Sequence, residues 1–522
     1  MSTTTSPNST TEQSTPHLPT PFILLLLLIS GALQPLTLAP YDLWFLGPLS
    51  IAVMLWAMQG LEPKSQQPVS ASKSFVYGWF VGFGLLGSGA SWVYISIHNF
   101  GNASPLLAGS LTFGFTGGIA ILTGLAFWIY FKLKNDSRLH NALIFLALWV
   151  LGDEVRTEFL TGFPWLFLGY GHLESPLSGW MPIIGVYGVT CITVATGIIA
   201  LLLISNISTR MKASLFAVTA AIWLIGIPLD SISWGKDEGK SLSVAMIQSN
   251  IPQNKKWKRS QRKKTLHLLE TLSTRHLHND LIIWPETAVP LLYDRATSFL
   301  DEMGKLAEEN STSIISGIPY REVDAETGQK TLHNSILSIG KGEGIYHKQK
   351  LVPFGEYVPL QDILRGLIDF FNLPMSDFRK GAPDQELLRS FDYKIAPFIC
   401  YEVVYPDFVA SQAINADFLL TISNDSWFGK SIGPLQHLQM AQVRAAENAR
   451  YMIRGTNNGV SAMIDEKGNI LAQSKQFVET TLESEVRVMS GRTPFSYITS
   501  YPLFLLCFLY LVWAVYLHKR KN

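Results

Sequence analysis

Residues 105–131 read PLLAGSLTFGFTGGIAILTGLAFWIYF, a run without a single charged side chain. It belongs to a longer stretch, residues 74–131, that also contains no Asp, Glu, Lys or Arg. A helix needs about 20 mostly apolar residues to cross the hydrocarbon core of a bilayer. The stretch is therefore long enough for two membrane-spanning helices, divided near residues 99–105.

Further weakly charged stretches extend this interpretation to eight predicted spans. They cover residues 21–37, 43–60, 75–97, 105–131, 139–152 (the shortest), 180–205, 213–229 and 498–517. By contrast, residues 230–492 contain 30 basic and 32 acidic side chains, which is typical of a globular domain. We therefore expect a disordered Ser/Thr/Pro-rich tail (1–20), a seven-span bundle (21–229), a soluble domain (230–492), and a last span with a basic tail (493–522).

The basic residues of the connecting loops predict the orientation of the chain. The alternate loops on one side contain a single basic residue, Arg156. The other loops and the C-terminal tail contain ten: Lys64, Lys73, Lys132, Lys134, Arg138, Arg210, Lys212, Lys519, Arg520 and Lys521. The C-terminus is therefore predicted to be cytoplasmic, with residues 230–492 on the opposite side of the membrane. The net charge of +1 gives no reason to expect a nucleic-acid partner.

Short apolar runs alternate with helical patterns in the soluble domain, which predicts an α/β fold. Strands are expected at 241–248, 280–285, 313–318, 331–339, 345–350, 394–400, 417–423 and 460–464, and helices at 259–278, 296–310, 406–414 and 435–452. Of the three cysteines, only Cys400 lies in this domain, because Cys191 and Cys507 fall within predicted spans. A disulfide framework is therefore excluded there.

Three chemically capable side chains follow predicted strands. Glu286 closes LIIWPE (281–286), Lys348 lies in IYHKQKLVPFGEYVP (345–359), and Cys400 lies in IAPFICYE (395–402). Singly, each has an ordinary structural explanation: a helix cap, a solvated lysine and a packed thiol. Together they supply a proton acceptor, a cation for a developing oxyanion, and a nucleophile, which is a complete set for acyl transfer without histidine or metal.

These motifs resemble the three catalytic signatures of the nitrilase superfamily, the carbon–nitrogen hydrolases. With an eight-span bundle attached, the chain resembles its membrane-tethered branch, the apolipoprotein N-acyltransferases, which complete the maturation of bacterial lipoproteins. The resemblance covers essentially the whole chain after its first 20 or so residues. Further matching segments are IQSNIPQNKKW (247–257), SNDSWFG (423–429), and GPLQHLQMAQVRAAENARYMIRGTNNGVSAMID (433–465).

The resemblance implies an αββα sandwich and a role for each motif residue. Glu286 is implied as the general base, Lys348 as the stabiliser of the tetrahedral intermediate, and Cys400 as the nucleophile. The supporting residues are implied as follows: Glu356 as a second active-site carboxylate, Tyr401 and Glu402 as residues that shape the pocket beside the thiol, and Trp257 as a residue near the acyl or substrate site.

The resemblance also implies the reaction. Cys400 accepts a fatty acyl chain from a membrane phospholipid as a thioester, and the α-amine of the N-terminal diacylglyceryl-cysteine of an apolipoprotein then takes it. We expect no cofactor and no metal, a monomer, and a multi-pass protein of the bacterial inner membrane with its catalytic domain in the periplasm.

Four further sequence features bear on function: an apolar segment, a basic run, a glycine motif and three histidines. Residues 362–378 (DILRGLIDFFNLPMSDF) fit either a lid that dips into the bilayer interface or a helix packed on its own domain. The basic run KKWKRSQRKK (255–264) fits the solvated face of a helix better than a site for lipid phosphates. GFGLLG (82–87) lies inside a predicted span and opens no dinucleotide-binding unit. His267, His276 and His278 lack the spacing of metal ligands.

Two alternatives remain at this point. A membrane-tethered amidase or nitrilase would use the same three residues and pass the acyl group to water. A transporter or scaffold with an inert external domain is disfavoured, because the spans lack the paired intramembrane charges that mark transport pathways.

Overall fold

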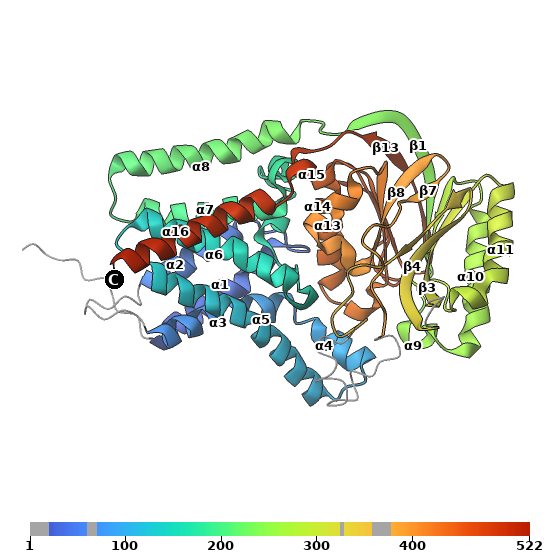
Figure 1. The fold of residues 1–522 in the computed structure, drawn as a ribbon, viewed down its shortest axis with the longest axis horizontal. Helices are drawn as coiled ribbons and strands as arrows, with labels where there is room; N and C mark the ends of the chain where they lie inside the picture. The colour runs from blue at the N-terminus through green and yellow to red at the C-terminus, as the bar shows by residue number, and fades with distance from the viewer. Residues whose placement is uncertain (1–19, 60–69, 324–327, 358–376, 522) are drawn as a thin grey trace, which may run out of the picture.

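The structure is a computed structural model that describes residues 20–59, 70–323, 328–357 and 377–521. It divides into a helical bundle and an α/β domain that lie against each other (Figure 1). Residues 362–378, expected to form either a lid or a helix packed on its own domain, fall outside the described residues except for Asp377 and Phe378.

Each of the eight segments predicted to span the membrane contains a long helix. The helices are α1 (Thr20–Leu33), α2 (Leu46–Gln59), α3 (Ala71–Gly89), α5 (Pro105–Leu133), α6 (Arg138–Glu158), α7 (Met181–Ile204), α8 (Thr209–Asp230) and α16 (Tyr501–Lys521). Among the described residues, five helical segments are long and apolar enough to cross a bilayer: Thr20–Thr37, Pro105–Leu133, Ser178–Ile204, Thr209–Asp230 and Tyr501–Arg520. Length and composition therefore leave the count of eight spans a prediction.

The helix α3 is followed by a sharp bend rather than by a straight continuation. Residues Val93–Phe100, which comprise α4 (Val93–Ile95) and the π-helical segment η2 (Ser96–Phe100), are turned by 61° from α3. Upstream of the bend, α3 packs tightly on α5, because a Cβ atom at Gly78 would lie 2.5 Å from the carbonyl oxygen of Thr123. Such close approach of glycine-bearing helices is typical of membrane bundles. The GFGLLG run is thus part of a packed helix.

The α/β domain contains two sheets packed face to face. Along the described chain, the first has the order β13-β1-β2-β3-β4-β6 and the second β12-β11-β10-β9-β8-β7-β5. The strands of the first sheet are β1 (Lys236–Gln248), β2 (Leu281–Ile283), β3 (Ser313–Val323), β4 (Lys330–Gly340), β6 (Ile345–His347) and β13 (Thr480–Ser490). Those of the second are β5 (Gly342–Glu343), β7 (Leu388–Ser390), β8 (Tyr393–Ile399), β9 (Phe418–Ser423), β10 (Met452–Thr456), β11 (Ala462–Ile464) and β12 (Ile470–Gln473).

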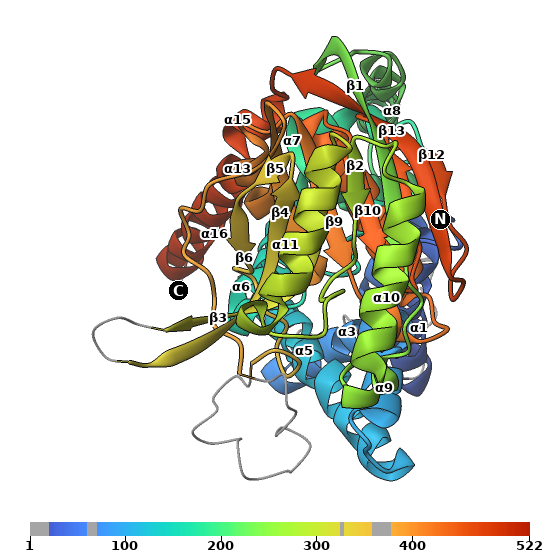
Figure 2. The same cartoon turned by 90° about the vertical axis from the view of Figure 1, so that its right-hand side faces the viewer.

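Helices cover both outer faces of the two sheets, which confirms the predicted αββα sandwich. Helices α10 (Arg259–Arg275) and α11 (Tyr293–Glu309) lie on the first sheet, as Figure 2 shows. Helices α13 (Pro406–Ala413) and α14 (Gly433–Asn448) lie on the second, between it and the bundle (Figure 1). Between the sheets, fully buried side chains such as Ile283 and Ile422 form a continuous apolar core.

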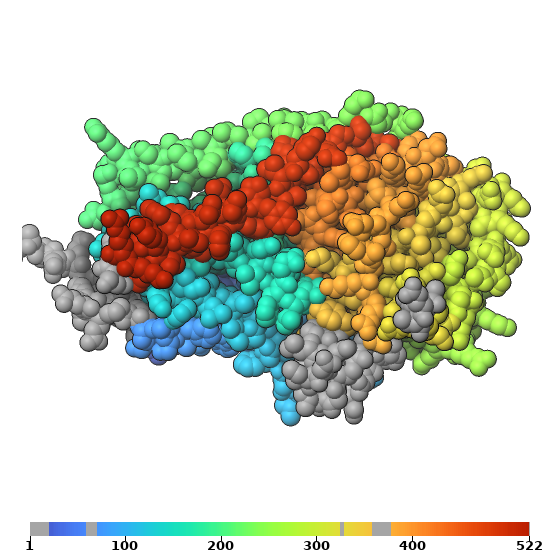
Figure 3. Space-filling view, in the orientation of Figure 1, coloured from blue at the N-terminus to red at the C-terminus, as the bar shows by residue number. Residues whose placement is uncertain are grey.

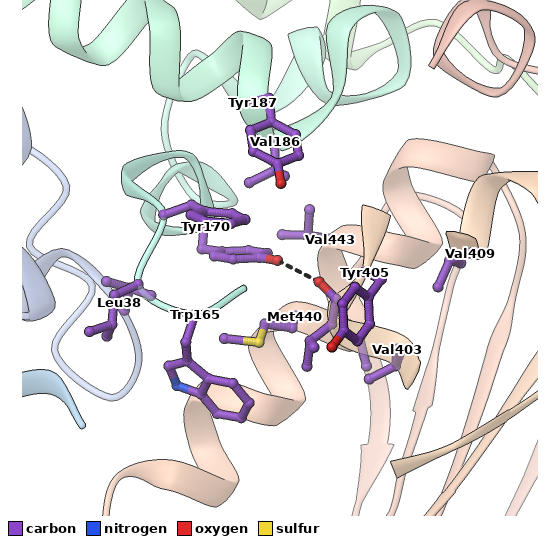
Figure 4. Packing of buried hydrophobic residues seen from close by; sticks show 14 of the residues in the cluster. Leu38, Trp165, Tyr170, Val186, Tyr187, Val403, Tyr405, Val409, Met440 and Val443 are labelled. Atoms are coloured by element: carbon purple, nitrogen blue, oxygen red, sulfur yellow. Dashed lines mark hydrogen bonds between the residues drawn. The ribbon is translucent and has the colours of Figure 1, made fainter. Parts of the chain in front are cut away.

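The bundle and the domain share one hydrophobic core. Tyr170 and Trp165 of the bundle pack with Met440 of α14 and with Tyr405 (Figure 4). Polar contacts cross the same boundary, because Trp165 Nε1 donates to Oε1 of Gln436 at 2.8 Å. The domain is therefore fixed to the bundle over a packed surface.

The chain enters and leaves the domain at one place. Helix α8 runs into β1, and β13 returns through α15 (Pro494–Ile498) into α16, which lies along the bundle surface in Figure 3. Strands β1 and β13 pair antiparallel, with Leu242 opposite Val486.

The second half of the domain differs from the sequence analysis in one helix boundary and in two edge strands. The helix predicted over 435–452 ends at Asn448, because Ala449 adopts a left-handed conformation (φ 47°, ψ 52°) and the chain then enters β10. The edge strands β12 and β13 were not predicted. Their side chains alternate between partly buried and exposed positions over much of their length, so an apolar run is missing.

Candidate active site

Glu286, Lys348 and Cys400 come together at one end of the sandwich. Each directly follows or closely follows a strand: β2, β6 and β8 respectively. Glu286 is 8% exposed and Lys348 is 1% exposed, and Lys348 Nζ lies 3.9 Å from Oε1 of Glu286. The charges of both side chains act on the thiol of Cys400. The structure thus brings two buried charged residues, Glu286 and Lys348, together with the partly buried Cys400.

Glu356 is the direct ion-pair partner of Lys348. Lys348 Nζ lies 2.9 Å from Oε1 and 2.8 Å from Oε2 of Glu356, and the Val352 amide donates to Oε2 at 2.9 Å. Burial alone lowers the pKa of a lysine, but the carboxylates of Glu356 and Glu286 outweigh it, so the pKa of Lys348 is raised. Lys348 therefore remains a cation.

Cys400 begins the short helix η7 (Cys400–Val404) with φ at 52°, a left-handed conformation that is costly for a residue with a side chain. This turn ends β8 abruptly. Burial, followed by the negative charge of Glu286, raises the pKa of the Cys400 thiol, while the charge of Lys348 lowers it. The net shift is upward, so the resting thiol is protonated and needs a base before it can attack.

Glu402 is fully buried and accepts hydrogen bonds from the segments that carry Lys348 and Cys400. On the Lys348 segment, the donors are the Tyr346 hydroxyl at 2.8 Å and the Gln349 amide at 2.6 Å. On the Cys400 segment, the Ile399 amide donates at 2.7 Å. Burial raises the pKa of Glu402 to about 7. The Glu402 carboxylate therefore connects the Lys348 segment to the Cys400 turn. This is a more specific role than the predicted one of shaping the pocket.

Tyr401 connects the cysteine turn to the bundle. Its hydroxyl donates to the carbonyl of Gly162 at 2.9 Å, in the loop that follows α6. Tyr357, next to Glu356, donates to the carbonyl of Leu160 at 2.8 Å in the same loop. Leu160 and Thr161 both have positive φ angles, 56° and 66°. The backbone carbonyls of this strained bundle loop thus accept hydrogen bonds from tyrosines on two segments of the site.

Trp257 lies in the wall of a cavity of about 180 Å³. The cavity is also lined by Arg262, Pro290 and Phe378, and Nε1 of Trp257 is buried without a hydrogen-bond partner in the described part of the chain. The structure therefore places Trp257 beside a cavity that reaches the site, because the amide of Phe378, which also lines it, donates to the carbonyl of Glu356 at 3.1 Å.

Sequence reasoning missed the side chains that hold Glu286. Asn334 Nδ2 donates to Oε1 of Glu286 at 2.8 Å and to Oε1 of Glu356 at 2.9 Å, and so bridges the two carboxylates. The amide of Asn424 donates to Oε2 of Glu286 at 2.8 Å. Asn424 belongs to the SNDSWFG segment, which pointed to the family without indicating a role.

Lys256 was assigned to a solvated basic face, and this prediction was wrong for that residue. It is 2% exposed, and its Nζ donates to the backbone carbonyl of Glu286 at 2.9 Å. Burial lowers its pKa to about 8, although the charge of Glu286 opposes the shift. Neighbouring Lys255 and Lys258 are exposed, as predicted.

A buried polar network contacts the backbone of Cys400. His437 lies with Nε2 3.1 Å from the Cys400 carbonyl, and Arg454 donates to Asp425 at 2.9 Å. Burial would raise the pKa of Asp425, but Arg454 and His437 lower it to about 2. Asp425 is therefore ionised, and the network fixes the turn that carries the thiol.

Family models match both parts of the chain. The family model of the apolipoprotein N-acyltransferase N-terminal domain matches residues 30–199, and that of the carbon–nitrogen hydrolases matches residues 243–493. A member of branch 10 of the nitrilase superfamily from Saccharomyces cerevisiae, a solved structure, has a TM-score of 0.36 and 18% identity. That match covers 48% of this chain and 90% of that chain.

Full-length relatives extend the similarity to the bundle. An apolipoprotein N-acyltransferase of Pseudomonas aeruginosa is 46% identical, covering 94% of this chain and 95% of the relative. One from Photobacterium profundum is 37% identical, covering 96% of each. The chain therefore belongs to the apolipoprotein N-acyltransferase family, as its motifs predicted.

Proposed function

We propose that this chain moves a fatty acyl chain from a membrane phospholipid to the α-amine of the N-terminal diacylglyceryl-cysteine of apolipoproteins. The observation that carries the proposal is the cluster of the buried Glu286 and Lys348 with the partly buried Cys400, beside a core that the sandwich shares with an apolar bundle. Bundle residues reach the site directly, because Tyr401 bonds to Gly162 and Ser96 Oγ donates to the carbonyl of Trp427 at 2.7 Å. A lipid donor held by the bundle would therefore be close to the thiol.

In the first half-reaction, Glu286 takes the proton of the Cys400 thiol as sulfur attacks the ester carbonyl carbon. Lys348 stabilises the oxyanion that forms. The intermediate collapses when the C–O bond breaks, and the departing lysophospholipid alkoxide takes the proton from Glu286. Cys400 is left as a thioester.

In the second half-reaction, the apolipoprotein amine attacks the thioester carbon. Glu286 accepts a proton from the nitrogen, the C–S bond breaks, and the thiolate recovers that proton. The products are an amide and the starting thiol, so no cofactor is needed. Homologues named for acyl transfer, rather than hydrolysis, favour the amine over water as acceptor.

The proposed setting is the inner membrane, with a monomeric chain, the domain in the periplasm and the C-terminus in the cytoplasm. The orientation is supported by the basic residues of the predicted loops, and the inner membrane by the family to which the chain belongs. The proposed division of the chain is that given by the sequence: a tail (1–20), a bundle (21–229), a catalytic domain (230–492) and a last span (493–522).

Intact-mass analysis after incubation with phospholipid tests the acyl-enzyme. We expect a single fatty-acyl increment on the parent protein and none on Cys400→Ala, because the alanine lacks the sulfur. Cys191→Ala, which removes a thiol from α7, should acylate like the parent. An increment retained by Cys400→Ala would show that the acyl group is carried elsewhere.

A further inference from the structure

Two imidazoles and a carboxylate converge at the end of β2 opposite to Glu286. His276 and His278 lie between α10 and β2, and Glu483 lies in β13. Oε1 of Glu483 is 2.9 Å from His276 Nδ1 and 3.0 Å from His278 Nε2. The three atoms lie within 4.8 Å of one another, the one such group of His, Cys, Asp or Glu found in the described residues. The spacing of the histidines did not predict this cluster, because its third member, Glu483, is distant in sequence.

We propose that His276, His278 and Glu483 bind a divalent transition-metal ion, with Zn²⁺ the best match. Two nitrogens and one carboxylate oxygen suit zinc, whereas Mg²⁺ and Ca²⁺ prefer oxygen ligands alone. Zinc binds these atoms at about 2.0–2.2 Å, so the 2.9 and 3.0 Å separations between Oε1 and the two nitrogens need to widen by only a few tenths of an ångström, and the nitrogens lie within 4.8 Å of each other. Water completes the coordination.

The ligands are already oriented by their surroundings. Asn279, which is 5% exposed, donates from Nδ2 to Oε1 of Glu483 at 2.9 Å. Its own carbonyl accepts from Thr312 Oγ1 at 3.0 Å. Glu483 is further fixed by the pairing of β13 with β1, where it lies opposite Ala245. The Asn279 amide also lies 3.2 Å from His278 Nε2, so zinc would displace this amide from the ligand atoms while the pairing of β13 with β1 holds Glu483 in place.

The position of the cluster predicts a structural effect. The side chains of His278 and Glu483 are 67% and 47% exposed, so an ion reaches them from solvent. Because β2 separates the cluster from Glu286, the bound ion takes no part in the reaction proposed above. It would link the residues before β2 to the edge strand β13 and stabilise the domain.

Zinc titration of the metal-free full chain in detergent tests this site. We expect saturable binding by calorimetry and an increase in Tm with zinc. His278→Asn and Glu483→Gln should each weaken zinc binding by about tenfold or more. The matched control is His267→Asn. His267 lies on α10 with its own carboxylate, Glu270, 3.5 Å away, but outside the cluster, so zinc affinity should be unchanged.

Acyl transfer without zinc verifies that the variants are folded, since the cluster is remote from the triad. Equal zinc affinity in the parent, His278→Asn and Glu483→Gln would overturn the proposal, as would the absence of saturable binding. Binding of Mg²⁺ as tight as that of Zn²⁺ would contradict the assigned class of ion.

Discussion

Glu286 is positioned by neutral donors, Asn334 and the amide of Asn424, while the cation of Lys348 stands 3.9 Å away. Lys348 is instead paired closely with Glu356. Burial raises the pKa of Glu286, and the nearby Glu356 charge adds to the shift against the opposing charge of Lys348. Burial outweighs the Lys348 charge and leaves the pKa of this carboxyl raised, which suits a group that must take and return a proton.

Glu286→Gln and Lys348→Met should therefore fail in different ways. The glutamine keeps the shape but cannot accept a proton, so both half-reactions should slow. The methionine removes the charge near the oxyanion, which typically costs about 2.7–4 kcal/mol, or roughly a hundred- to a thousandfold in rate. Iodoacetamide labelling and phospholipid-dependent acylation, measured side by side, separate the two. Normal acylation by Glu286→Gln would transfer the role of base to Glu356.

Lys256 should set the alkaline limit of activity. Its pKa of about 8 lies below the ordinary lysine value, so the ammonium that holds the Glu286 carbonyl is present below pH 8 and is lost as pH rises above it. Lys256→Met should slow acylation at every pH and should remove the fall in rate above pH 8. Lys256→Arg, which stays charged, should retain activity to higher pH. The control Lys255→Met, at an exposed position, should reproduce the parent pH–rate profile. If Lys256→Met also gave the parent profile, Lys256 would not set the alkaline limit.

At the scale of elements, the loop after α6 links the bundle to the cysteine turn. Backbone carbonyls of this loop accept hydrogen bonds from the hydroxyls of Tyr357, Tyr401 and Tyr405. In addition, Glu158 at the end of α6 lies 3.5 Å from Lys350. Each tyrosine is one or a few residues from a site residue. Strain of this kind persists only where the surroundings hold it, so the loop and the turn stabilise each other.

Tyr401→Phe should weaken this connection without removing any reacting group. Loss of one such hydrogen bond costs about 0.5–1.5 kcal/mol, so we expect thioester formation to slow by up to about tenfold while the protein stays folded. The rate of acyl-enzyme formation measures it. Tyr293→Phe, on the exposed side of α11, is the control. A parental rate in Tyr401→Phe would mean that the turn is held without the bundle.

The strand ends of the site were predictable, but their polar surroundings were not. Apolar runs before Glu286 and Cys400 marked buried strands, so these two residues fell at strand ends. Asn334 lies within β4, where a single polar residue looks like any exposed position of a strand. Lys256 was hidden among exposed lysines. The end of α14 was missed because Ala449 favours a helix locally, and its left-handed turn comes from tertiary packing.

At the scale of the molecule, the loop charges predict where each part of the chain lies. A reporter fused after Leu229 or within residues 230–492 should report the periplasmic side, and one at Asn522 the cytoplasmic side. Alkaline phosphatase activity in fusions distinguishes the two compartments. If both fusions reported the same side, the count of eight spans would be wrong, and α6 would be the first helix to reconsider.

The pairing of β1 with β13 has a consequence for synthesis. The ribosome makes β1 first among the strands and β13 last, so the edge of β1 that β13 covers stays open while almost the entire domain is translated. An open edge is a template for wrong pairing. The final strand emerges just before α16, so closure of the first sheet and insertion of the last helix fall at nearly the same moment. A nascent chain released earlier would be anchored in the membrane with an unfinished sheet exposed.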